Sequence, residues 1–309
     1  MLDTPRFHHL HLNSVDPDAA IDFYVHQFGS TSRTTWNGSP ALASPNDVLI
    51  LFSRVSSAPP VDPDTAIWHF GWHVTDVRSS LESYRGREGL ALLPLYTGEG
   101  DNFVVISSDT WPGAGGTLGR TRDEIVEAKK SGVRPKLGAG FAYLQGPDCA
   151  IVEYAGDHPV ERFNHVHMWQ EQPICAQVWY QQHLGASILP GAPSADADDC
   201  SATRGVDRSF PSLDPDGMFR KPSGGVAFGD VWLPWYMRQG EQPLTSTRGH
   251  LYDHFALAVA DLNAWIQRLD AGGVRFLEDV YALGDTRAVM ICGPSQEAIE
   301  LVEIRGSGT

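Results

Sequence analysis

The sequence predicts an α+β fold made of four copies of one module, in which a strand, a helix and about three more strands follow one another. The segments Arg6–Leu12 (RFHHLHL) and Arg162–Met168 (RFNHVHM) are nearly identical. Two more histidine-containing segments, Trp68–Asp76 and His250–Asp261, also precede a helix-like pattern. A Gly-Pro turn leads to a glutamate at the same offset in both halves of the chain. Self-similarity of this kind is the signature of a repeated supersecondary unit.

The four units pair into two halves that meet near residue 157. A helix that covers one face of a curled antiparallel sheet leaves the concave face free for a site. We therefore expect four βαβββ modules paired into two curled-sheet domains, residues 1–157 and residues 158–309, each with one cup-shaped hollow.

The first module begins with Arg6–Leu12, whose side chains alternate as in a half-buried strand. His9, His11 and Phe7 are therefore expected on the same face of this strand. The spacing of apolar residues predicts a helix over Asp18–Phe28.

The second module begins with Trp68–Asp76, and Asp76 is a suitable N-cap for the helix that follows. We expect three strands and one short helix after it, at Phe103–Ser107, Phe141–Leu144, Cys149–Tyr154 and Arg122–Ser131 respectively.

The third module carries a helix near Pro173–Leu184, which Gly185 ends. The polar stretch Pro190–Gly225 is long enough to be a lid or mobile loop, and the strand Val231–Met237 follows it. In the fourth module, a helix after Asp261 precedes three strands, at Val274–Leu277, Ala288–Cys292 and Ala298–Ile304.

Composition limits the classes of function. The 309 residues suffice for two domains, and the formal net charge of -15 argues against nucleic-acid and anionic-membrane partners. No apolar stretch reaches the length of a membrane span, and the N-terminus lacks a signal-peptide pattern. The four cysteines are scattered, which favours free thiols in a reducing compartment. We expect a cytoplasmic protein.

Histidine occupies the matching place in all four first strands when the strands are aligned by the helix that follows each. These residues are His9, His69, His165 and His254. The last strand of each half adds a glutamate, Glu153 or Glu300, among apolar neighbours. A carboxylate is costly to bury unless a cation or a metal pairs with it. Two imidazoles and one carboxylate make a facial triad that leaves metal positions open for substrate or oxygen.

This four-module pattern resembles the vicinal oxygen chelate superfamily, which includes glyoxalase I, extradiol ring-cleaving dioxygenases, fosfomycin-resistance proteins and methylmalonyl-CoA epimerase. The resemblance implies a divalent metal: Fe(II) or Mn(II) for a ring-cleaving dioxygenase, with Zn or Ni as alternatives. It implies two ligand sets, His9, His69 and Glu153 in the first half and His165, His254 and Glu300 in the second. His11, His73 and His167 are expected behind the ligands or at the edge of the core.

The acid–base histidine of the ring-cleaving dioxygenases has no counterpart between residues 230 and 249. The nearest candidates for a catalytic role are His250 and Tyr252. The tyrosine that this family carries near its glutamate strand corresponds to Tyr143 in the first half but to Met290 in the second. Purely structural roles stay open for all three candidates.

Three functions remain as alternatives at this point. The first is an extradiol-dioxygenase-like enzyme that acts on a small substrate with adjacent oxygens. The second is a glyoxalase-like lyase or isomerase, and the third is a non-catalytic binding or resistance protein. The long edge of the first strand also makes a homo-oligomer plausible.

Overall fold

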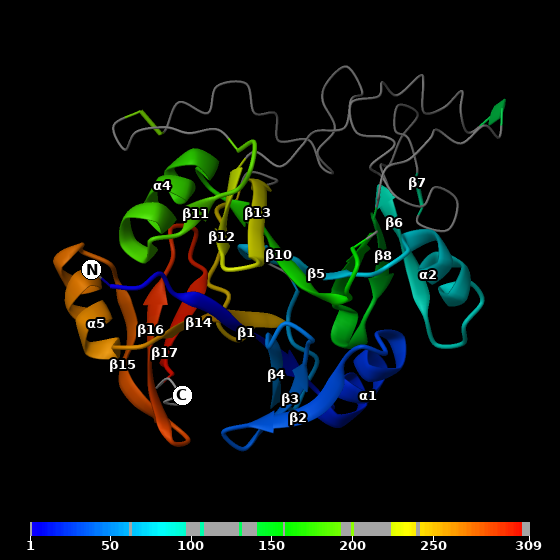
Figure 1. Cartoon of the computed structure of the whole chain (residues 1–309), viewed down its shortest axis with the longest axis horizontal. Helices are drawn as coiled ribbons and strands as arrows, with labels where there is room; N and C mark the ends of the chain where they lie inside the picture. Colours follow the sequence, from blue (N-terminus) through cyan, green and yellow to red (C-terminus); the bar gives the residue numbers. More distant parts are fainter. Residues whose placement is uncertain are drawn as a thin grey trace.

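The computed structural model describes residues 2–61, 64–96, 106–107, 130–131, 141–156, 158–192, 199–200, 224–238 and 242–304. The predicted α+β class is confirmed: two large mixed sheets carry a few short helices (Figure 1). The expected helix Arg122–Ser131 and the stretch Pro190–Gly225 lie mostly outside the described residues, and of the strand expected at Phe103–Ser107 only the last two residues are described.

The modules at the two ends of the chain form one sheet, which we call the outer sheet. Its strand order is β15-β16-β17-β14-β1-β4-β3-β2. The bounds are β1 Arg6–Ser14, β2 Ser32–Trp36, β3 Ser39–Ala43, β4 Leu49–Arg54, β14 Tyr252–Val259, β15 Phe276–Leu283, β16 Thr286–Cys292 and β17 Ala298–Glu303.

The two middle modules form the second sheet, which we call the inner sheet. Its strand order is β11-β12-β13-β10-β5-β9-β8-β6-β7. The bounds are β5 Ile67–His73, β6 Ala91–Tyr96, β7 Ile106–Ser107, β8 Phe141–Gln145, β9 Ile151–Ala155, β10 Arg162–Gln170, β11 Ser187–Ile188, β12 Gly224–Phe228 and β13 Val231–Met237.

Within the described ranges, each module has one complete α-helix, and these helices are α1 Pro17–Gln27, α2 Val77–Tyr84, α4 Pro173–Leu184 and α5 Leu262–Ala271. The expected N-cap Asp76 accepts a hydrogen bond from the backbone N–H of Ser79 at 3.0 Å. Gly185 adopts the left-handed conformation that ends α4. Figure 1 shows α1 and α2 at one end of the molecule and α4 and α5 at the other.

The expectation that modules pair within each half of the chain was wrong. β1 runs antiparallel to β14, so the first module pairs with the fourth. β5 runs antiparallel to β10, so the second module pairs with the third. The four first strands present similar edges and similar side chains, and the sequence therefore does not state which two of them meet. Each cup combines residues from both halves of the chain.

Each first strand also contains a one-residue bulge directly before its aligned histidine. The bulge residues are His8, Trp68, Asn164 and Asp253, each of which the strand register skips. A bulge breaks the alternation of side chains and re-aims the residue that follows it. Phe7 and His9 therefore do not share a face, contrary to expectation.

Phe7 instead packs in the core between the two sheets. Its ring stacks on Phe163 at 5.6 Å and on Phe255 at 5.8 Å, measured between ring centroids. The hydroxyl of Tyr252 also joins the sheets, because it donates to the carbonyl oxygen of Ile151 at 3.1 Å and accepts from its N–H at 2.9 Å. The two cups are thus fixed to one shared core.

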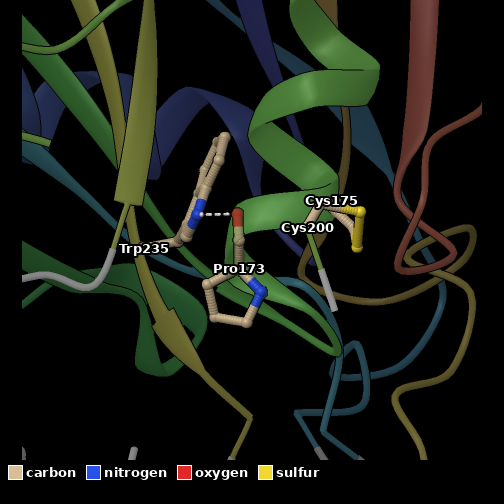
Figure 2. Close-up of a disulfide and its surroundings, with 4 residues drawn as sticks. All are labelled: Pro173, Cys175, Cys200 and Trp235. Atoms are coloured by element: carbon tan, nitrogen blue, oxygen red, sulfur yellow. Dashed lines mark hydrogen bonds between the residues drawn. A yellow bond between two sulfur atoms is a disulfide. The ribbon is translucent and has the colours of Figure 1, made fainter. Parts of the chain in front are cut away.

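The prediction of four free thiols was also wrong. Cys175, in the first turn of α4, forms a disulfide with Cys200 (Figure 2), while Cys149 and Cys292 are free. The partners are 25 residues apart in sequence, so no close spacing signalled the pair. Stable disulfides are typical of oxidising compartments, which removes the cysteine-based argument for the cytoplasm. No helix among the described residues is long and apolar enough to cross a membrane.

Two candidate metal centres

The inner cup, formed by the second and third modules, brings together His69 from β5, Glu153 from β9 and His165 from β10. The distance from His69 Nε2 to Glu153 Oε2 is 3.1 Å, and the distance from His165 Nε2 to the same oxygen is 3.6 Å. The two Nε2 atoms lie 3.4 Å apart. Ligands at adjacent positions on a metal with bonds of about 2.1 Å are about 3.0–3.4 Å apart. These three atoms therefore have the spacing of a facial ligand set.

A glycine makes room for this arrangement. Gly71 is the partner of His165 across the β5–β10 pair. A Cβ atom at residue 71 would lie 2.0 Å from Cε1 of His165, a distance that no real contact allows. The His165 ring thus lies over the backbone of β5, where only glycine permits the approach.

His167 also faces the inner cup, although it was expected behind the ligands. The donor atoms of His69, Glu153, His165 and His167 all lie within 4.8 Å of one another. The buried Nε2 atom of His167 has no hydrogen-bond partner among the described residues, and its ring stacks on Tyr236 at 4.9 Å. An orphaned imidazole nitrogen beside three ligand atoms fits a bound metal or substrate.

Protonation in the inner cup also suits a metal. Burial lowers the pKa of His69 to about 4 and holds the pKa of His167 well below 6.5. Burial alone would raise the pKa of Glu153, but the imidazoles of His165 and His69 hold it far below its ordinary value. At neutral pH the cup therefore presents neutral His69 and His167 imidazoles and an ionised carboxylate, the forms that bind metal ions.

The outer cup, formed by the first and fourth modules, repeats the triad with His9 from β1, His254 from β14 and Glu300 from β17. Oε2 of Glu300 lies 3.4 Å from Nε2 of His9 and 3.9 Å from Nε2 of His254. Both Glu300 Oε2 and His9 Nε2 are buried without a hydrogen-bond partner among the described residues. Two orphaned polar atoms that face each other fit a metal between them.

The residues behind the outer triad are polar. Nδ1 of His254 lies 2.7 Å from Oδ1 of Asp253, which also pairs with Arg248. Tyr281 donates a hydrogen bond to Oε1 of Glu300. Burial raises the pKa of Glu300, the opposite of the shift at Glu153.

His11 is the third imidazole of the outer cup. Its donor atom lies within 4.8 Å of those of His9 and His254. Its Nε2 hydrogen-bonds to the hydroxyl of Ser53 at 2.8 Å, and burial lowers its pKa to about 3. His11 and His167, which occupy equivalent places, are thus both in the cups rather than behind them.

The two cups differ in their walls. The inner cup is a cavity of about 410 Å³ whose walls are largely aromatic, with Phe141, Tyr143, Trp232 and Tyr236 among its lining residues. The outer cup is a cavity of about 310 Å³ lined by the charged residues Arg248, Asp253 and Glu278 beside its ligands. Among the described lining residues, the inner cup has no lysine or arginine.

The ligand grouping that the resemblance implied was wrong, although the six residues do form two clusters. The structure groups His69 and His165 with Glu153, and His9 and His254 with Glu300. The cause is the pairing of modules across the two halves, since each glutamate strand lies beside the first strand of its own module.

The three predicted catalytic candidates lie in different places. Tyr143 faces the inner cup, with its ring 5.2 Å from that of His69. Tyr252 and His250 lie outside both cups and line a separate cavity of about 280 Å³. β14 begins only at Tyr252, and the bulge at Asp253 turns Tyr252 away from His254. A catalytic role for His250 or Tyr252 stays a prediction.

Sequence reasoning missed three residues of the outer cup, Arg248, Asp253 and Tyr281. Tyr281 comes from β15, so it supplies a phenol near Glu300 from a strand other than the one that carries Met290. The pair Asp253-His254 is the one local signal, because carboxylates often orient metal-binding histidines.

Comparisons with known proteins support the fold. No protein-family model and no curated protein sequence matches the chain. Among solved structures, glyoxalase I from Zea mays is 14% identical, with 97% of this chain and 92% of that chain covered and a TM-score of 0.59. A glutamate-to-glutamine variant of the same enzyme is also 14% identical, with 97% of this chain and 94% of that chain covered and a TM-score of 0.61. A putative dioxygenase from Bacillus subtilis is 11% identical, with 98% of this chain and 86% of that chain covered and a TM-score of 0.58.

The fold and the two buried His/Glu clusters define a class of protein, one with paired βαβββ modules around candidate metal sites. The chain shares its fold with these glyoxalase I and putative dioxygenase structures, which is the fold that the resemblance implied.

Proposed function

We propose that this protein is a metal-dependent enzyme of the vicinal oxygen chelate type, and that its inner cup performs extradiol-dioxygenase-like chemistry on a small substrate with adjacent oxygens. The observation that carries the proposal is the convergence of His69, Glu153 and His165 at 3.1–3.6 Å inside a cavity of about 410 Å³. Two histidines and one carboxylate are the donor set of non-haem Fe(II) oxygenases, and Mn(II) suits the same ligands.

A bound Fe(II) or Mn(II) ion would supply open coordination positions and redox chemistry, and the protein residues would do the rest. His69, His165 and Glu153 would hold the ion. Nε2 of His167 is free among the described residues to accept a hydrogen bond from a substrate hydroxyl. Burial raises the pKa of Tyr143 well above 10, so its phenol keeps its proton and can donate a hydrogen bond at neutral pH.

The aromatic walls of the inner cup suit a planar substrate ring. Tyr236 stacks on His167, and Trp232 lies at the cavity with 44% of its surface exposed. Aromatic side chains in this arrangement can stack on the faces of a ring and exclude water from it. A catecholic substrate without anionic substituents fits these walls best, because the described walls offer no lysine or arginine.

The direct test is metal content and oxygen uptake on protein purified without oxygen and loaded with Fe(II). We expect the wild type to bind stoichiometric metal and to take up oxygen when a catechol is added. We expect His165→Ala to lose the metal of the inner cup and the oxygen uptake. His73→Ala is a matched control, since His73 lies on β5 but stacks on His158 outside the cup. A wild type that binds no stoichiometric metal would overturn the enzyme proposal and favour the binding-protein alternative.

One observation favours a glyoxalase-like isomerase as a second candidate, at the outer cup. Glu300 has a free buried oxygen and a burial-raised pKa, so its carboxyl can exchange a proton with a substrate carbon. A redox-silent ion such as Zn or Ni would act there as a Lewis acid. We expect Zn-loaded protein to isomerise the methylglyoxal–glutathione hemithioacetal, and Glu300→Gln to abolish this. Activity retained by Glu300→Gln would exclude this candidate.

A further inference from the structure

The side chain of each bulge residue is the neighbour of the ligand histidine that follows it. Asp253 Oδ1 lies 2.7 Å from Nδ1 of His254, and Asn164 Nδ2 lies 3.0 Å from Nδ1 of His165. In the same way, Nδ1 of His8 lies 2.8 Å from Nδ1 of His9. The fourth bulge residue, Trp68, leaves Nδ1 of His69 without a partner among the described residues.

These contacts decide which ring nitrogen carries the proton. A neutral histidine that presents Nε2 to a metal carries its proton on Nδ1, and it needs a hydrogen-bond acceptor there. An ionised aspartate can only accept, so Asp253 selects the tautomer of His254 that binds metal. The N–H of Gly249 donates to Oδ2 of Asp253 at 2.7 Å and fixes the carboxylate in place.

Arg248 binds the same carboxylate without taking the place of His254. Its guanidinium pairs with Asp253 and with Glu278, and its Nη1 is 3.3 Å from Nδ1 of His254, farther than the carboxylate oxygen. Arg248 therefore balances the charge of Asp253 and leaves it as the acceptor for His254.

The inner cup lacks this selection. The amide of Asn164 offers both a donor and an acceptor, so it satisfies either tautomer of His165. In the structure the amide nitrogen faces Nδ1, which suits the tautomer with its proton on Nε2. That tautomer cannot bind a metal through Nε2, and the amide must turn over before His165 can do so. The indole of Trp68 has no acceptor to offer His69.

We propose that the residue in each bulge is a positioning residue that sets the metal affinity of the histidine after it, and that Asp253 makes the outer cup the tighter site while Asn164 keeps the inner cup weaker and exchangeable. The inference rests on the proposed function, because it presumes that both cups take a metal ion.

The experiment is a reciprocal exchange, Asp253→Asn and Asn164→Asp, with Co²⁺ as the probe. Glu153→Ala isolates the outer cup and Glu300→Ala isolates the inner cup, so each exchange is measured at one site. Co²⁺ affinity is measured by competition with a chelator, and the visible absorption of bound Co²⁺ reports the ligand set. We expect Asp253→Asn to weaken the outer site about 10–100-fold and Asn164→Asp to strengthen the inner site by about tenfold.

Asp230→Asn is the matched control, since Asp230 pairs with Arg162 and lines neither cup. Unfolding of the metal-free variants separates tautomer selection from a loss of structure. This inference alone would be overturned if both exchanges left the Co²⁺ affinity within threefold of that of their backgrounds. It would also be overturned if Asn164→Asp weakened the inner site. Backgrounds that bind no Co²⁺ before any exchange would instead overturn the proposed function.

Discussion

The inner and outer cups have the same candidate ligand triad but differ in the residues that surround it. Each has a triad of two imidazoles and a glutamate from equivalent strands. In the inner cup, the imidazoles hold the pKa of Glu153 low, whereas in the outer cup burial raises the pKa of Glu300. Aromatic side chains line the inner cup, and the charged residues Arg248, Asp253 and Glu278 line the outer cup. The comparison teaches that a duplicated ligand triad does not imply duplicated chemistry.

The largest expected effect is on metal binding, and it comes from one strand position that differs between the two cups. Gly71 pairs with His165 in the inner cup, and Ala256 pairs with His9 in the outer cup. Gly71→Ala places a Cβ 2.0 Å from the His165 ring, so it should displace the ring and weaken inner-cup metal binding by more than 100-fold, about 3 kcal/mol by the usual conversion.

Metal titration with the inner cup isolated by Glu300→Ala measures this effect. Ala256→Gly, with the outer cup isolated, is the reciprocal control, because it adds backbone freedom worth only about 1 kcal/mol and no clash. Unchanged metal binding in Gly71→Ala would show that His165 is not a ligand.

The second effect is on how the stability of the metal-free protein depends on pH. The folded pKa of His69 is about 4 and the unfolded value is 6.5, so unfolded chains bind the proton more readily between these values. The stability that neutral His69 contributes is present above pH 6.5 and is lost as the pH falls toward 4, by about 3 kcal/mol.

Denaturant unfolding of the metal-free protein from pH 7 to pH 4 measures this loss, and His69→Phe should reduce it. Glu300 acts in the opposite direction, since a raised pKa means that protonation favours the folded state. A His69→Phe profile parallel to that of the wild type would contradict the assigned cause.

The smallest effect tests the phenol of the outer cup. Tyr281→Phe removes the hydrogen bond to Glu300 and should weaken outer-cup metal binding by about 1.5 kcal/mol, roughly tenfold. Inner-cup binding should not change. Tyr24→Phe is the control, because the buried Tyr24 hydroxyl has no partner among the described residues. Equal effects of Tyr281→Phe on both cups would argue for a general loss of stability instead.

Local patterns in the sequence predicted the modules and all six triad residues. Helix spacing, the N-cap Asp76 and the Gly185 stop depend on neighbours in the chain, and the structure confirms them. The aligned histidines were visible because repeats place them at one offset from each helix.

The features that sequence reasoning missed depend on contacts between distant segments. Which first strands pair, and hence which histidine meets which glutamate, is decided by edges that look alike in all four modules. The bulges at His8 and Asp253 follow from that pairing, and a period of two along a strand cannot reveal them. The bond between Cys175 and Cys200 likewise joins positions that only the fold brings together.

The most direct test of the cup assignment is the metal stoichiometry of two double variants. His9→Ala/Glu300→Ala damages the outer cup alone and should leave about one metal ion per chain, whereas His9→Ala/Glu153→Ala damages both cups and should leave none. If the second variant kept one ion while the first lost both, each half of the chain would hold its own site, and the pairing of modules described above would be contradicted.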